Sequence, residues 1–181
     1  MAITAKAKKL KAEGKDVVSF AAGEPDFKTP AHICEAAKQA ADDGAFHKYL
    51  PNPGLPALRE AVGARFQQDI GVAYSSDEVL VSPGAKYSLF LACQALIGDN
   101  DEAILPSPYW VSYPEMVRLA GGDTVYLETS EANGFAVTAA DISAKITPKT
   151  KLLILTSPCN PTGAVVPPSE IEAIGKLLED K

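Results

Sequence analysis

Residues 151–163 read KLLILTSPCNPTG, an apolar run that ends in a turn. The run Lys151 to Leu155 has the length and composition of a buried strand, and the two prolines and the glycine behind it stop both strand and helix. Asn160 is therefore held at the carboxyl end of a strand, where open α/β sheets bind their ligands. Because Asn, Pro and Gly also fill ordinary turns, the same residues are consistent with a plain connection from strand to helix.

Three further loops stand where a short apolar run ends. They are GEPDF (Gly23 to Phe27) after Val17 to Phe20, SPGAK (Ser82 to Lys86) after Val79 to Val81, and SPYWVSYP (Ser107 to Pro114) after Ala103 to Leu105. Four such loops in one chain weigh against the interpretation as plain turns.

The order of elements predicts an α/β fold with a mostly parallel sheet. Strands are expected to begin near Val79, Glu102, Asp123 and Lys151, with helices over Gly84 to Ile97 and Tyr109 to Gly121 between the first three. This spacing is typical of strand-helix-strand units whose sheet is covered on both faces, a three-layer α/β/α architecture. Further helices are expected over Ala2 to Glu13, from Thr29 and Pro30 to Gly44, and over Leu55 to Gly71, the last with an apolar stripe at Leu58, Val62, Phe66 and Ile70.

The composition excludes several classes of protein. With 46% hydrophobic and 22% charged residues, 181 residues suffice for one domain core, and the net charge of -6 argues against nucleic-acid binding. Cys34, Cys93 and Cys159 form no C-x-x-C pair, and His32 and His47 are the only imidazoles, so we expect neither a disulfide framework nor a metal site. No signal-type core and no run of about 18 apolar residues is present. We therefore expect a cytoplasmic chain whose partners are small molecules or other protein chains, not membranes.

The turn Ser82 to Lys86 predicts an anion site. Its small residues lie between a predicted strand and a predicted helix, and they expose backbone N–H groups at a helix N-terminus, where anions bind. Taken alone, the turn is explained better by an ordinary strand-to-helix connection that contains the helix-breaking Pro83.

Together and in this order, the four loops resemble those of the fold-type I pyridoxal-phosphate aminotransferases of class I/II, most closely the aspartate aminotransferases. The segments AAGEPDF, SPYWVSYPEMVRLAGG and SPCNPTGAV are long enough to be specific. The resemblance implies that residues 1–45 are an N-terminal segment with a helix, a short strand, a substrate loop and part of a small domain. It implies that residues 46–181 are part of the large α/β domain that binds pyridoxal 5'-phosphate.

The resemblance also implies an N-terminal fragment. Family members carry an Asp-x-x-Tyr segment, a Ser-x-x-Lys segment with the Schiff-base lysine, and a late arginine beyond the NPTG loop, and we expect all three beyond Lys181. We therefore assign no catalytic residue, and we expect the fragment alone to be inactive and not to attach the cofactor covalently.

Roles for individual residues follow from the same resemblance. Backbone N–H groups of Gly84, Ala85 and Lys86 would hold the cofactor phosphate, Lys86 by its N–H and not as the Schiff-base amine. Trp110 would stack on the pyridine ring and contact substrate, although a large aromatic is more often a core residue. Asn160 would donate its amide to the phenolic oxygen of the cofactor and also contact substrate.

Two further residues resemble family positions, Gly23 at the start of the GEPDF loop and Tyr49 outside the four loops. The backbone of Gly23 would approach the substrate carboxylate, where a side chain would obstruct. Tyr49 would reach the phosphate of a neighbouring subunit in a homodimer, although a half-buried loop tyrosine explains it equally well. The peptide bonds Ser107–Pro108 and Asn160–Pro161 are both expected to be cis, against the usual preference for trans.

The implied activity is ping-pong transfer of an amino group between L-aspartate, or a similar amino acid, and a 2-oxo acid such as 2-oxoglutarate. Two alternatives remain open. One is another reaction on the same fold, as in an aromatic aminotransferase or a lyase, and the other is a non-catalytic domain that binds a phosphate-bearing ligand.

Overall fold

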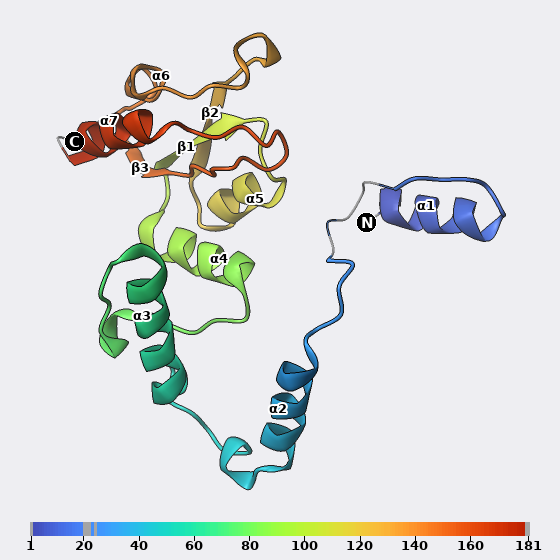
Figure 1. Ribbon diagram of the computed structural model, residues 1–181. Coiled ribbons are helices and arrows are strands. Elements are labelled where there is room, and N and C mark those ends of the chain that lie inside the picture. The colour runs from blue at the N-terminus through green and yellow to red at the C-terminus, as the bar shows by residue number, and fades with distance from the viewer. Residues whose placement is uncertain (1, 20–22, 24, 180–181) are drawn as a thin grey trace. The chain divides into compact units, whose positions relative to one another are not determined.

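The computed structural model describes residues 2–19, 23 and 25–179, in two compact units, Met1–Pro51 and Asn52–Lys181 (Figure 1). The first unit holds α1 (Ala2–Ala12), α2 (Ala31–Asp42) and the 3-10 helix η1 (Gly44–Phe46). Both helices were predicted, but α2 has Pro30 and not Thr29 at its N-cap. The strand expected over Val17 to Phe20 is absent from residues 17–19, and Phe20 lies outside the described residues.

The second unit is built on three strands. They are β1 (Glu102–Ser107), β2 (Asp123–Glu128) and β3 (Thr150–Leu153), in the order β2-β1-β3 with both pairings parallel. The register of β1 on β2 is regular, whereas β1 on β3 shifts between Glu102 and Ala103. The predicted parallel α/β fold is confirmed.

The second unit also contains five described α-helices. They are α3 (Pro56–Ile70), α4 (Ala85–Leu96), α5 (Ser112–Leu119), α6 (Ala139–Ser143) and α7 (Pro168–Glu179), with the 3-10 helices η2 (Ser76–Glu78) and η3 (Glu131–Asn133).

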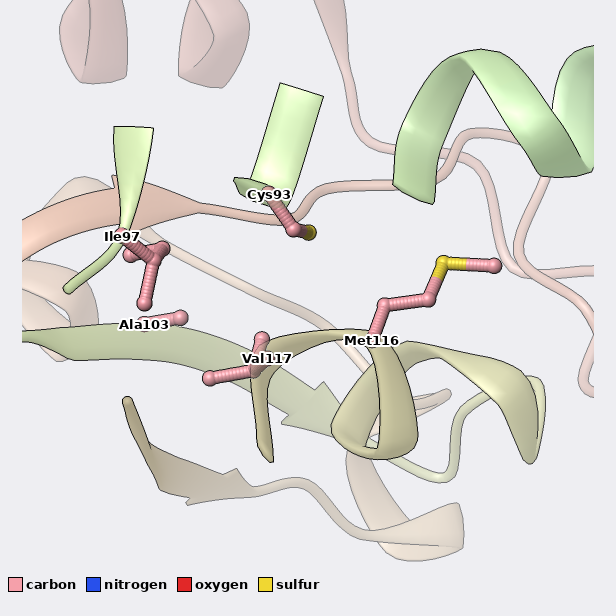
Figure 2. Packing of buried hydrophobic residues seen from close by; sticks show 5 residues of the cluster. All are labelled: Cys93, Ile97, Ala103, Met116 and Val117. Atoms are coloured by element: carbon pink, nitrogen blue, oxygen red, sulfur yellow. The ribbon is translucent and has the colours of Figure 1, made fainter. Parts of the chain in front are cut away.

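Two apolar cores cover the two faces of the sheet. The first joins Ala103 of β1 to α4 and α5 through Cys93, Ile97, Met116 and Val117 (Figure 2). The second joins Ile104 to Leu127, Val137, Ile142 and Ile174, which brings in α6 and α7. Because successive strand residues point to opposite faces, Ala103 belongs to the first core and its neighbour Ile104 to the second. The predicted helical cover on both faces is confirmed.

One prediction about the start of this unit is wrong. Val79 to Val81 is extended but belongs to none of the three described strands; Val81 donates its N–H to the Pro53 carbonyl at 2.9 Å instead. The helix expected over Leu55 to Gly71 is present as α3, but its apolar stripe is largely uncovered, since Leu58 and Phe66 are each 44% exposed and Ile70 is 59% exposed. The buried residue of α3 is Gly63, because the helix packs against the backbone of Tyr74 at this position.

Candidate functional site

The loops that follow β1 and β3 contact each other at one edge of the sheet. Parallel strands place their carboxyl ends together, so the residues after Ser107 and after Leu153 come to the same edge. Tyr113 Oη lies 2.9 Å from Thr156 Oγ1, and the Cys159 thiol donates to the Pro108 carbonyl at 3.5 Å. The two loops that carry Trp110 and Asn160 are therefore tied by hydrogen bonds.

The loop that carries Asn160 is closed by its own backbone. Cys159 donates its N–H to the Ala164 carbonyl at 2.8 Å, and Gly163, with a φ of +75°, donates its N–H to the Cys159 carbonyl at 2.7 Å. Val166 donates its N–H to Ser157 Oγ at 3.0 Å. Asn160 lies between these bonded residues and is exposed.

The loops also show the expected proline geometry. The bonds Ser107–Pro108 and Asn160–Pro161 are both cis, as predicted. A third cis bond, Ser157–Pro158, was not predicted.

Trp110 is half-buried and serves partly as a core residue. It packs against the cluster on the α4 and α5 side of the sheet and meets the ring of Tyr113 edge-on, with ring centres 5.3 Å apart. Lys86 Nζ lies 4.7 Å from the centre of the indole ring, a cation–π distance. Trp110 thus links the loop after β1 to the N-terminal turn of α4.

The turn before α4 presents backbone donors. Gly84 has a φ of +93° and a ψ of 161°, and a side chain there would meet no atom within 4 Å. Its own N–H donates to the Ser82 carbonyl at 2.7 Å. Ala85 and Lys86 are the first residues of α4, whose N–H groups have no partner within the helix and lie at the positive end of its dipole. The turn therefore fits a phosphate group, with Ala85 and Lys86 as the donors best placed to bind it.

A cavity of about 230 Å³ lies at the same edge of the sheet. Its wall includes Tyr109, Tyr113, Phe135, Thr156 and Asn160. The loop after β2 contributes Thr129 and Phe135 to this wall, and Thr129 Oγ1 donates to the Ser107 carbonyl at 2.6 Å. This loop was missed from the sequence, although the Asn133-Gly134 dipeptide is a turn signal.

Two groups around the sheet, Tyr126 and Cys93, have raised pKa values. A hydrogen bond with Tyr109 raises the pKa of Tyr126, whose ring stacks on that of Tyr109 with centres 5.3 Å apart. Burial raises the pKa of the Cys93 thiol, which confirms this cysteine as a packing residue.

Gly23 and Tyr49 belong to the first unit, and both are exposed. Their predicted roles stay predictions. Across the described ranges, no group of His, Cys, Asp and Glu is arranged to hold a metal ion, and none of the described helices is long and apolar enough to cross a membrane.

Comparison with known proteins defines the class to which this fold and site belong. The model of the aminotransferase class I and II family matches residues 15–181, so the chain belongs to that family.

Its similarity to particular members is high. The chain is 49% identical to the aspartate aminotransferase of Geobacillus stearothermophilus over 177 residues, which cover 98% of this chain and 45% of that protein. It is 46% identical to the aspartate/prephenate aminotransferase of Thermus thermophilus, again over 98% of this chain and 46% of that protein. The structure of a Thermus thermophilus aspartate aminotransferase with maleate superposes with a TM-score of 0.92 over 99% of this chain and 47% of that one. The chain thus spans less than half the length of these relatives.

Proposed function

We propose that the protein to which this chain belongs transfers an amino group between L-aspartate, or a similar amino acid, and a 2-oxo acid such as 2-oxoglutarate, with pyridoxal 5'-phosphate as cofactor. The observation that carries the proposal is that the loops of Lys86, Trp110 and Asn160 contact one another. Lys86 lies over the ring of Trp110, and the loop of Trp110 is hydrogen-bonded to the loop of Asn160. Backbone donors, an aromatic face and an amide are the groups that a phosphate-bearing pyridine ring with a phenolic oxygen requires.

Each residue has a distinct task in this proposal. The N–H groups of Ala85 and Lys86, with Gly84 leaving room beside them, bind the phosphate. Trp110 stacks on the ring and keeps water from its face, and Asn160 donates its side-chain N–H to the phenolic oxygen. When bound, the cofactor supplies an electron sink for the amino acid.

The remaining assignments are also proposals. Residues 46–181 form part of a large cofactor-binding domain, while residues 1–45 contribute Gly23 near the substrate carboxylate. Tyr49 reaches the phosphate of a second subunit, so the working protein is a homodimer. The cysteines of this chain are all free, which supports a reducing cytoplasm.

The cofactor site can be tested on this chain with Trp110 fluorescence, because Trp110 is the only tryptophan. Pyridoxamine 5'-phosphate is the suitable probe, since it has no aldehyde to react with surface lysines. We expect saturable quenching, and binding of pyridoxamine, which lacks the phosphate, that is about tenfold weaker or more. Asn160→Ala should weaken the binding of both probes. The control Asn52→Ala changes an exposed asparagine outside the loops and should weaken the binding of neither.

Equal quenching by the two probes would contradict the phosphate site, and an Asn160→Ala variant with unchanged affinities would remove Asn160 from it. For the whole protein, three rates are compared: amino transfer from aspartate to 2-oxoglutarate, amino transfer from phenylalanine, and elimination from an amino acid. A dominant first rate supports the aspartate assignment, whereas a dominant second or third rate supports the aromatic aminotransferase or the lyase. Phosphate-dependent binding without any turnover would favour the non-catalytic domain.

A further inference from the structure

Arg59 of α3 is a charged residue that the proposed function does not use. Its side chain is only 12% exposed, yet its ion-pair partner Asp77 is 94% exposed. Arg59 Nε donates to the Val79 carbonyl at 2.9 Å, and Nη2 lies 3.2 Å from Asp77 Oδ1. An exposed carboxylate contributes little to holding an arginine, so the backbone carbonyl of Val79 is the partner that matters.

The segment that Arg59 contacts, Val79 to Val81, lies outside the described sheet. Val79 to Val81 pairs with none of the three described strands, so other contacts must fix its position. Val81 N–H bonds the Pro53 carbonyl, and Gly54 approaches so closely that a Cβ there would lie 2.7 Å from Val81 Cβ. Arg59 supplies the side-chain hydrogen bond to this segment.

Directly after this segment comes the turn that presents the phosphate donors. Gly84, Ala85 and Lys86 are exposed at the N-terminal end of α4, whereas the buried anchors of this helix, Cys93 and Ile97, lie at its other end. Apart from the contact of Lys86 with Trp110, the donor end of α4 therefore has little support from the core. Its position also depends on the chain that leads into it, and Arg59 holds that chain.

We infer that Arg59 is a positioning residue of the phosphate turn, which it holds in binding geometry through the Val79 carbonyl. The inference rests on the proposed phosphate site. Arg59 does not touch the ligand; it fixes the backbone whose N–H groups do. Donors held in advance bind an anion without a further ordering cost, so loosening them weakens the phosphate contact selectively.

The test compares two arginines of the same helix. Arg59→Gln removes the hydrogen bond from the guanidinium to the Val79 carbonyl. The matched control Arg65→Gln removes the same charge from an exposed arginine that pairs with Asp69 at 2.7 Å. Each chain is titrated with pyridoxamine 5'-phosphate and with pyridoxamine by Trp110 fluorescence. We expect Arg59→Gln to weaken binding of the phosphate-bearing probe about tenfold and binding of the phosphate-free probe less than about twofold. Arg65→Gln should change neither affinity by more than about twofold.

A second measurement covers the case in which Arg59→Gln fails to fold. Arg59→Lys keeps the charge and is the milder change, and hydrogen–deuterium exchange should be faster in residues 79–88 of this variant and unchanged in β1 and β2. Unchanged exchange in residues 79–88, or equal weakening of both probes by Arg59→Gln, would overturn the inference. Equal binding of the two probes by the unaltered chain would instead remove the phosphate site, and this positioning role with it.

Discussion

Individual residues at this site are constrained by backbone geometry as much as by chemistry. Gly84 has a φ of +93° with a ψ of 161°, a region that is essentially restricted to glycine. No neighbouring atom lies within 4 Å of a Cβ built there, so the requirement for glycine is conformational and not steric. A side chain at this position would move the N–H groups that follow.

We therefore predict that Gly84→Ala costs about 1–3 kcal/mol of folding free energy through backbone strain. The substitution should also weaken the binding of pyridoxamine 5'-phosphate more than the binding of pyridoxamine. Urea unfolding followed by circular dichroism measures the first effect and Trp110 fluorescence the second. An alanine variant as stable as the parent would mean that the turn adopts another backbone conformation in solution.

At the scale of elements, α3 is held against the chain that follows it at a point of close backbone approach. A Cβ on Gly63 would lie 2.4 Å from the Tyr74 carbonyl oxygen, and Phe66 meets the ring of Tyr74 edge-on with centres 5.2 Å apart. A carbonyl oxygen cannot swing aside as a side chain does. The helix and residues 72–79 must therefore separate if position 63 acquires a side chain.

A pair of glycine substitutions tests this contact. Gly63→Ala should destabilise the chain by about 1–3 kcal/mol through overpacking, although alanine is the better helix former. Gly175→Ala in α7 makes the same chemical change where nothing lies within 4 Å, and it should stabilise by about 0.4–1 kcal/mol. Chemical denaturation gives both values, and a stabilising Gly63→Ala would contradict the close packing of α3.

At the scale of the whole molecule, much apolar surface is left uncovered. Both β2 and β3 are edge strands of the described sheet, and large apolar side chains such as Val111 (75%), Leu119 (62%) and Val165 (65%) are exposed. Unpaired strand edges and exposed apolar patches are common sites of association between chains.

We therefore predict that the 181-residue chain self-associates as its concentration rises. We also predict that it has no transaminase activity of its own, since it spans less than half the length of its aminotransferase relatives. Sedimentation velocity over a concentration series measures the association, and a coupled assay with aspartate and 2-oxoglutarate measures the activity. A chain that stays monomeric at high concentration and unfolds in one cooperative transition would be a self-sufficient domain, contrary to this expectation.

The amino-acid sequence by itself determined the class of fold and the order of the loops, and the two expected cis bonds followed from the family resemblance. These features are local: an apolar run such as Lys151 to Leu155 predicts a strand, and a cluster of proline and glycine predicts the loop behind it. The family resemblance and the helix limits of α3, which ends before Gly71 with its φ of +72°, depend on the same short-range signals.

Only the tertiary structure decided which of these segments meet. The Val79 to Val81 run has the composition of a strand, but strand formation needs a partner, and this segment is bonded to Pro53 and Arg59 instead. Periodicity placed Leu58 and Phe66 on one apolar stripe, but burial depends on what packs against a helix, and the close contact falls at Gly63. Likewise, no spacing in the sequence places Lys86 over Trp110 or Tyr113 against Thr156, because these pairs are made by chain segments that only the folded sheet brings together.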